Sequence, residues 1–357
     1  MNETLSIRAN IMKVINIDKE KWASGVESLT STYRLFGPVK EDDSHNFKEL
    51  KKGELPDLAY GNSKLSPKSA VFPPSEAMFT YSLDEKNENH HILNDVKKDY
   101  SPRAVLGIRP CDAKAVSLVR MNFDTKEYRD PYWMDAFEAT TFVGLACDNP
   151  CSTCFCTSTG CGPFSEEGLD VLLVENGNAY IAKALTAKGE KLMDAAGFKT
   201  AGDDSAIAAK KAAAEAKITA SIETDKLSEK VIMDLYDAPI WDDISFSCIN
   251  CCTCTYACPT CWCFDIQDEN KGLSGVRMRN WDSCMTPLFT MHGSGHNPRS
   301  QKKQRVRQRF MHKLKYFLDK YQKGIMCVGC GRCVQQCPVN IDIRTVSKKM
   351  NDYVAAS

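Results

Sequence analysis

The chain has 357 residues, and its 46 lysines and arginines balance its 46 aspartates and glutamates. This length suits two domains with buried cores, and the zero formal net charge excludes nucleic-acid binding through overall charge. No apolar stretch approaches the roughly 18 residues of a membrane-spanning helix, and the N-terminus shows no secretory signal. We therefore expect a cytoplasmic protein without a membrane span or a nucleic-acid partner.

Cysteine is the unusual residue of the composition, with 18 copies. All but Cys111 and Cys284 fall into three islands, at 147–161, 248–263 and 327–337. Disulfides are disfavoured in a reducing cytoplasm, and cysteines two or three residues apart are poorly placed to bridge one another. The islands therefore indicate thiolates that bind metal.

The first part of the chain is expected to mix helices and strands. Residues 1–36 are interpreted as largely helical, and residues 37–75 as a polar loop. A helix is predicted from Ala113 to Met121. Three apolar, β-rich runs predict strands: 104–108, 141–146 and 169–174. The alternation of strands and helices predicts an α/β domain, which we place at residues 1–225.

The first cysteine island directly follows the strand predicted over 141–146. The strand predicted over 104–108 leads into Cys111 in the same way, so two strand ends of one sheet could bring Cys111 beside the island. This arrangement predicts an iron–sulfur site, unless Cys111 is a buried, inert thiol. The island also matches the three-cysteine loop of radical S-adenosylmethionine enzymes, but fewer than 100 residues separate it from the next island. That length is too short for the barrel those enzymes need.

Residues 203–230 are rich in alanine, lysine and glutamate, which is typical of a solvated helix or a helical linker. We therefore expect a domain boundary near 225–240. A mainly helical, two-cluster, ferredoxin-like domain is predicted over 240–357, so the fold class is α+β as a whole.

The last two islands contain the clearest motif. Cys327-Val-Gly-Cys330-Gly-Arg-Cys333-Val-Gln-Gln-Cys337-Pro338 matches the C-x2-C-x2-C-x3-C-P run of bacterial ferredoxins, and Cys248 to Pro259 repeats it. In such pairs, each run gives three ligands to its own [4Fe–4S] cluster and the fourth to the other. The predicted first cluster has the ligands Cys248, Cys251, Cys254 and Cys337. The predicted second cluster has the ligands Cys258, Cys327, Cys330 and Cys333. Zinc would need only four of these eight ligands.

Three further cysteines, Cys261, Cys263 and Cys284, lie close to the second island in the sequence. They could hold another metal or pack as core thiols, and the sequence does not separate these alternatives. Between the two runs, apolar residues from Val306 to Tyr321 recur at helical spacing. The opposite face of this helix, from Lys302 to Lys315, is strongly basic. We interpret it as a solvated face whose charge offsets the negative clusters and cysteinate ligands nearby, rather than as a docking surface for an acidic partner or an RNA.

Taken together, these motifs resemble the iron–sulfur β subunit of cytoplasmic sulfhydrogenases and the A subunit of anaerobic sulfite reductase. The electron-transfer subunit of flavin oxidoreductases that feed heterodisulfide reductase is similar. The resemblance covers roughly residues 70 to 345. The matching segments are Phe72-Pro-Pro-Ser-Glu76, Arg109-Pro-Cys-Asp112, Asp130-Pro-Tyr132, Cys154-Phe-Cys-Thr157, Cys258-Pro-Thr-Cys261, Trp281-Asp-Ser-Cys284 and the run around Arg305 to Lys313.

The resemblance implies four ligands for a third cluster: Cys111, Cys147, Cys154 and Cys156. It makes Cys151 and Cys161 weaker candidates, because glycine or another small residue is frequent at their positions. Cys252 also stands where the family tends to have glycine.

The sequence contains no G-x-G-x-x-G motif for a flavin or nicotinamide. A chain with clusters but no two-electron cofactor needs partners, so we expect a one-electron relay without catalytic residues of its own. The resemblance implies a flavin-containing NAD(P)H or ferredoxin-type oxidoreductase subunit on one side. On the other side it implies a terminal hydrogenase, sulfite reductase or heterodisulfide reductase module of anaerobic metabolism. The alternative is a self-sufficient thiol/disulfide or sulfur reductase that uses the extra cysteines.

Overall fold

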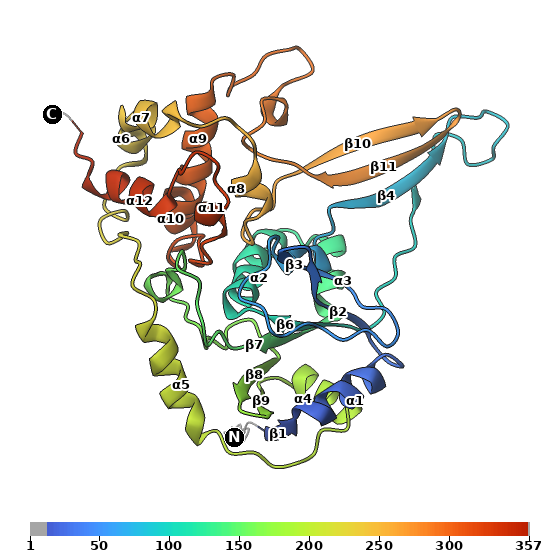
Figure 1. The fold of residues 1–357 in the computed structure, drawn as a ribbon. Helices are drawn as coiled ribbons and strands as arrows, with labels where there is room; N and C mark the ends of the chain where they lie inside the picture. The colour runs from blue at the N-terminus through green and yellow to red at the C-terminus, as the bar shows by residue number, and fades with distance from the viewer. Residues whose placement is uncertain (1–12, 356–357) are drawn as a thin grey trace, which may run out of the picture.

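A seven-stranded sheet forms the base of the molecule in the computed structural model, which describes residues 13–355 (Figure 1). Its strand order is β1-β9-β8-β7-β6-β2-β3. The four central strands, β8, β7, β6 and β2, run parallel, and the strands at both edges pair antiparallel. The strands are β1 (Val14–Asp18), β2 (Arg34–Glu41), β3 (Ser44–Glu49), β6 (Arg103–Ile108), β7 (Thr140–Leu145), β8 (Val171–Asn176) and β9 (Ala179–Ala184).

Two pairs of helices supply the apolar side chains that cover this sheet. The core on one face includes side chains of α1 (Lys19–Leu29) and α4 (Ala187–Ala195). The core on the other face includes side chains of α2 (Pro110–Phe123) and α3 (Pro131–Glu138). Alternate residues of each strand enter opposite cores, as Ala104 and Leu106 of β6 do on the first face and Val105 on the second. Most residues of β6, β7 and β8 are therefore apolar and buried, and this pattern is what predicted them as strands from the sequence.

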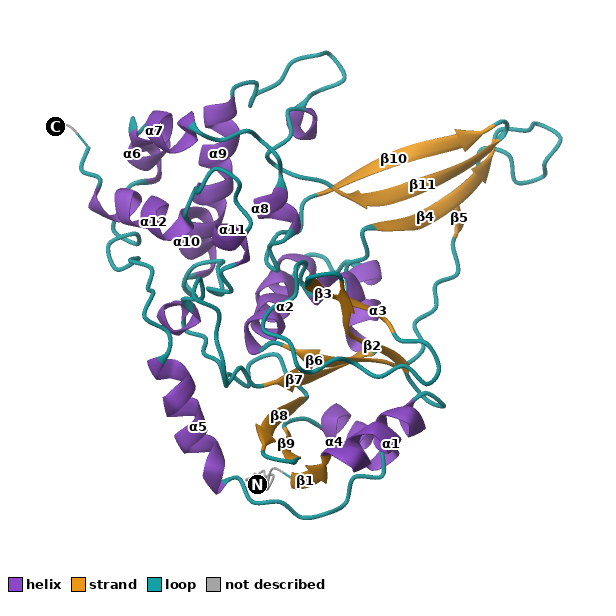
Figure 2. Cartoon of the chain, in the orientation of Figure 1, coloured by secondary structure: helices purple, strands orange, loops and turns teal. Residues whose placement is uncertain are grey.

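A second, four-stranded sheet in the order β10-β11-β4-β5 projects from the body (Figure 2). It combines strands from distant parts of the chain: β4 (Ser75–Ser82), β5 (Asn94–Asp95), β10 (Phe264–Lys271) and β11 (Ser274–Trp281). Strand β11 pairs antiparallel with both β10 and β4. The prediction that residues 240–357 are mainly helical is not confirmed, because this region also contributes the β10–β11 hairpin.

The remaining elements are helices, many of them short, and most of those after α5 surround a third apolar core. The α-helices are α5 (Ser205–Ala216), α6 (Ile232–Tyr236), α7 (Ile240–Phe246), α8 (Thr253–Tyr256), α9 (Lys302–Met311), α10 (Phe317–Tyr321), α11 (Arg332–Gln335) and α12 (Ile343–Asp352). A π-helical segment, η4 (His312–Tyr316), joins α9 to α10. The 3-10 helices are η1 (Pro67–Ala70), η2 (Cys156–Thr159) and η3 (Leu288–Thr290). Within the described part of the chain, no helix has the length and apolar character needed to cross a membrane.

The strands predicted over 104–108, 141–146 and 169–174 are confirmed as β6, β7 and β8. The helix predicted from Ala113 is α2, which begins earlier, at Pro110. The interpretation of residues 1–36 as mixed and largely helical was only partly right for the described part, because α1 is flanked by the strands β1 and β2. The loop predicted over 37–75 was also partly wrong, because it contains the end of β2 and all of β3. Polar side chains on an edge strand leave no apolar signal, so β3 was missed.

Candidate metal centre

The thiols of the first cysteine set meet around one cavity. Its lining includes Cys248, Cys251, Cys252, Cys254 and Cys337. Cys337 comes from the last cysteine island, so the chain brings together the four residues predicted for the first cluster. Backbone N–H groups already point at two of the sulfurs: Asn250 donates to Cys248 Sγ at 3.4 Å, and Ile341 donates to Cys337 Sγ at 3.2 Å. Such hydrogen bonds to sulfur help to set cluster potentials.

A second, more deeply buried cavity is lined by the thiols predicted for the second cluster. They are Cys258, Cys327, Cys330 and Cys333. Two cations, Arg309 and Lys313, line the same cavity. Lys313 Nζ donates to Thr260 Oγ1 at 2.7 Å, and Thr260 Oγ1 lies 3.3 Å from Cys258 Sγ. The cavity therefore combines four thiols with fixed positive charge.

The two ferredoxin runs adopt the same local turn despite their different residues. Gly329 and Gly331 have φ values of 64° and 72°, and the corresponding Asn250 and Cys252 have 54° and 64°. Left-handed backbone costs little for glycine but strains a residue that has a Cβ. Cys252, which stands where the resembling family tends to have glycine, therefore keeps the turn at a local cost and places a fifth thiol in the first cavity.

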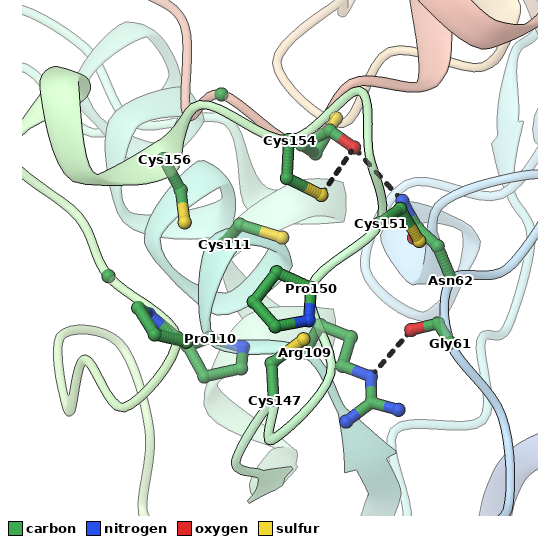
Figure 3. A pocket seen from close by; sticks show the side chains of 14 residues that line it. Gly61, Asn62, Arg109, Pro110, Cys111, Cys147, Pro150, Cys151, Cys154 and Cys156 are labelled. Carbon is green, nitrogen blue, oxygen red and sulfur yellow. Dashed lines mark hydrogen bonds between the residues drawn. The ribbon is translucent and has the colours of Figure 1, made fainter. Parts of the chain in front are cut away.

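The first cysteine island forms a third cavity with Cys111 (Figure 3). Its lining cysteines are Cys111, Cys147, Cys151, Cys154, Cys156 and Cys330. Figure 3 shows the sulfurs of Cys111, Cys147, Cys154 and Cys156 around a common space. The Cys151 thiol lines the same cavity and is hydrogen-bonded to the Cys154 thiol. The four residues implied by the family resemblance are therefore gathered together, and Cys161 lies outside the lining.

Arg109 fixes the strand ends that build this third cavity. It follows β6 directly, and its guanidinium donates to the carbonyl oxygens of Gly61 and Ala146, each at 2.9 Å. It also stacks on the Tyr60 ring, 4.3 Å from the centroid. The loop before η1, the end of β6 and the end of β7 are thereby held together. Sequence reasoning assigned no role to Arg109, although its position beside Cys111 at a strand end could have suggested one.

A buried ion pair joins the third cavity to the last ferredoxin run. Arg332 donates to both carboxylate oxygens of Asp112, at 2.6 and 2.7 Å, and to the Ser63 carbonyl oxygen at 2.9 Å. Arg332 and Asp112 are each only 1% exposed. Backbone contacts continue the junction, because the Phe155 N–H donates to the Gly329 carbonyl at 2.9 Å. Sequence reasoning missed this pair, whose members directly adjoin Cys333 and Cys111.

The interpretation of the Lys302–Lys315 stretch as a solvated basic face was wrong for most of its cations. Buried carbonyls accept many of their hydrogen bonds: Arg305 donates to Met285 at 3.1 Å, and Lys315 donates to Leu227 at 2.8 Å. Periodicity could not reveal this arrangement, because a charged residue has the same pattern whether it meets water or a carbonyl. The buried cations are Arg305, Arg307, Arg309, Lys313 and Lys315, which are 1–8% exposed.

The donor sets fit iron–sulfur clusters. Burial raises the pKa of Cys254 to about 11 and that of Cys156 to about 12, so these thiols would keep their protons unless a metal replaced them. A positive charge that could balance an anionic cluster is also present. The guanidinium of Arg309 lines the first two cavities, and its buried Nε has no hydrogen-bond acceptor. Each cavity thus supplies at least four thiols and is lined by an arginine suited to an anionic cluster, Arg309 in the first two and Arg109 in the third.

The three cysteines left open by the sequence lie near the base of the β10–β11 hairpin. Cys263 precedes β10, and its carbonyl accepts from the Asp282 N–H at 3.0 Å. A hydrogen bond from the Cys284 thiol lowers the pKa of Cys263 to about 7, and the Cys261 carbonyl accepts from Lys68 Nζ at 3.0 Å. Among the described residues, no three His, Cys, Asp or Glu side chains converge as a site for a single metal ion.

Comparison with known proteins agrees with this geometry. Residues 247–341 match the model of a family described as a 4Fe-4S dicluster domain. The chain is also 28% identical over 346 residues to "Sulfhydrogenase 2 subunit beta" of Pyrococcus furiosus, an alignment that covers 93% of this chain and 96% of the relative. No solved structure matches the chain. The chain is therefore a homologue of that subunit and an iron–sulfur protein with a 4Fe–4S dicluster domain.

Proposed function

We propose that this iron–sulfur protein is an electron-transfer subunit that relays single electrons through three [4Fe–4S] clusters. Its partners would be a flavin-containing NAD(P)H or ferredoxin-type oxidoreductase subunit and a terminal reductase or hydrogenase subunit. The relative from Pyrococcus furiosus is named a sulfhydrogenase subunit, which favours a hydrogenase over a sulfite reductase or heterodisulfide reductase module. A complex of this kind belongs to anaerobic metabolism.

The observation that carries the proposal is the arrangement of the three thiol-lined cavities as a series. Arg309 lines both the first and the second cavity, and Cys330 lines both the second and the third. Neighbouring sites thus share a side chain, so clusters held there would lie close enough for successive one-electron steps. The first cavity reaches the surface at the exposed Cys251, which supports this end as a point of electron entry or exit.

The proposed ligands are the three sets of cysteines predicted from the sequence and the family resemblance. The clusters would supply one-electron redox chemistry with little structural rearrangement. The protein supplies the thiolates, backbone N–H donors such as those of Asn250 and Ile341, and buried cations that compensate negative charge. Residues 1–225 would provide the third site and residues 240–357 the other two, as two parts of one relay.

We place the protein in the cytoplasm, because all 18 cysteines are free thiols in the structure and a reducing compartment preserves them. The alternative, a self-sufficient disulfide or sulfur reductase, is less well supported. That alternative would use Cys251 and Cys252, or Cys261, Cys263 and Cys284. Cys252 and Cys284 are buried, each 7% exposed, and Cys261 and Cys263 are only partly exposed, which limits the access of an external substrate.

Anaerobic purification followed by iron and sulfide analysis and EPR spectroscopy tests the proposal. We expect iron and sulfide for three clusters, and no turnover of a disulfide by the chain alone with reduced viologen. An iron-free, zinc-loaded chain would contradict the cluster assignment. Turnover of a disulfide by the isolated chain would contradict the relay and support the reductase alternative.

A further inference from the structure

Arg309 lies where the first two thiol-lined cavities meet. It belongs to helix α9 and is only 3% exposed, and among residues 13–355 it is the one cation that lines both cavities. Lys313, one helical turn later, lines the second cavity but not the first. Arg309 is therefore distinguished from the other buried cations of this stretch by its position between two sets of cysteines.

The guanidinium of Arg309 has few partners within the protein. Its Nη2 donates only a long hydrogen bond, 3.4 Å, to the Cys254 carbonyl oxygen, and its Nε has no acceptor. No carboxylate lies within ion-pair distance of it among the residues that the structure describes. Arg332, by contrast, is neutralised by both oxygens of Asp112. A buried cation left without an anion is costly, so a negative group is expected beside Arg309.

The nearest candidates for that negative charge come from both cysteine sets. Desolvation alone would lower the pKa of Arg309, but the sulfurs of Cys254 in the first set and Cys333 in the second outweigh it and raise the pKa. Cys333 in turn receives a hydrogen bond from the guanidinium. The side chain thus interacts with at least one proposed ligand of each cluster.

We propose that Arg309 is a shared counter-charge that raises the reduction potentials of the first and second clusters together. The inference rests on the proposed function only in requiring that both cavities hold clusters. Reduction adds negative charge to a cluster, and a fixed cation nearby stabilises the reduced form, since net charge and hydrogen bonds to sulfur set the potential. One residue would keep two neighbouring steps of the relay matched in potential.

The test is an anaerobic redox titration followed by EPR, on the full chain loaded with iron and sulfide. In R309Q, we expect the ratio of reduced to oxidised cluster at a fixed potential to fall about tenfold for both clusters, which is about 59 mV for a one-electron couple. The third cluster should not change, because Arg309 does not line its cavity. R309K keeps the charge and should shift both potentials much less.

The matched control is R307Q, which removes a buried arginine of the same helix. Arg307 donates to the Tyr236 carbonyl at 2.9 Å and stacks on the ring of that residue, so its loss should leave all potentials in place. Fully loaded R309Q with unchanged potentials, or with a shift in one cluster only, would overturn the proposal. R309Q could also load iron only at the third site. In that case the proposal stands if R309K and R307Q load all three sites, because a positive charge at residue 309 is then what the first two clusters need. The proposal falls if R309K also loads only the third site, because the shape of the arginine side chain, and not its charge, would then be required.

Discussion

The two ferredoxin runs and the first cysteine island build thiol-lined cavities by different means. In the runs, the sequence spacing itself places the thiols, and the same left-handed turn occurs at Cys252 and at Gly331. At the third site, Cys111 comes from the first turn of α2 and the island thiols from the segment after β7, and they are brought together by the parallel sheet and by Arg109. The geometry of the first two sites is therefore largely determined within each ferredoxin run, whereas the third site depends on contacts between distant segments.

Charge differs between the two kinds of site as well. Arg309 and Lys313 face the C-terminal cavities without a carboxylate partner. At the third cavity, Arg332 is neutralised by Asp112, whereas Arg109 donates to carbonyl oxygens, which leave its charge in place. The second cavity thus has two cations that could compensate cluster charge, and the third has one that also connects the strand ends.

Loss of a single thiol should have the largest effect and tests whether the sites are independent. We expect Cys258→Ser to abolish the second cluster and Cys111→Ser to abolish the third, each with loss of about a third of the iron, because both residues are proposed ligands. Iron analysis and EPR of the anaerobically purified variants provide the measurement.

Cys161→Ser is the control for this experiment, since Cys161 lies outside the third cavity. It should retain all the iron. Full iron content in Cys111→Ser would show that Cys151 or another thiol replaces Cys111 as a ligand. The assignment of Cys111 to the third cluster would then be contradicted.

Breaking the buried Arg332–Asp112 ion pair should weaken the junction between the last ferredoxin run and the third cavity. Arg332→Ala leaves the Asp112 carboxylate buried without its partner, and we expect the free energy of unfolding to fall by about 3–5 kcal/mol. Anaerobic urea denaturation measures the change. Arg344→Ala is the matched control: its pair with Asp342 is about a quarter exposed, so its loss should cost at most about 1 kcal/mol. Equal effects in the two variants would contradict a special role for the buried pair.

A methyl group at Gly329 should disturb the contact between the last run and the first island. Gly329 has a φ of 64°, and an added Cβ would lie 2.5 Å from the backbone of Cys156. We expect Gly329→Ala to destabilise the protein by about 2–4 kcal/mol through strain and overpacking, with weakened binding of the third cluster. Gly324→Ala shares the positive φ but meets no atoms, so it should cost only about 1–2 kcal/mol and retain the cluster. A smaller loss in Gly329→Ala than in this control would contradict the contact.

The smallest expected effect is a pH dependence of the free energy of unfolding, caused by one histidine of the C-terminal region. Burial of His312, beside Trp262, lowers its pKa from 6.5 to about 4. The unfolded chain therefore takes up a proton near pH 6.5 that the folded chain refuses until about pH 4, so stability falls as pH drops through this window. Between pH 8 and pH 6 we expect a loss of about 0.8 kcal/mol. Urea denaturation of His312→Phe should lack this part of the pH dependence, and an unchanged profile would show that another group causes it.

The sequence could predict the features that depend on neighbouring residues. Spacing within the runs predicted which thiols of the C-terminal region the structure gathers, and apolar runs predicted β6, β7 and β8. The third cavity was predicted in outline, because two strands that end in cysteine can meet at one edge of a parallel sheet. Its assembly around Arg109 and the Arg332–Asp112 pair was not predicted, since these contacts join residues 36 to 220 positions apart.

Other features left no local signal. Strand β10 is polar and exposed along nearly its whole length, so neither alternation nor apolar content marks it as a strand. The buried basic helix α9 was misread for the opposite reason: its charges look solvated in sequence but bond to carbonyls or face thiols. In both cases, the structure depends on the segment against which the residues pack, which their own residue types do not reveal.

The projecting sheet and the first cavity each combine segments that are far apart in the sequence, which has a consequence for biogenesis. Strand β4 leaves the ribosome long before β11, its neighbour in the sheet, and the first cavity closes only when Cys337 arrives. The first cluster can therefore be completed only after nearly the whole chain has been made, and its early cysteines remain without metal until then. A cell that makes this protein needs to shield those thiols from oxygen and stray ions in the meantime.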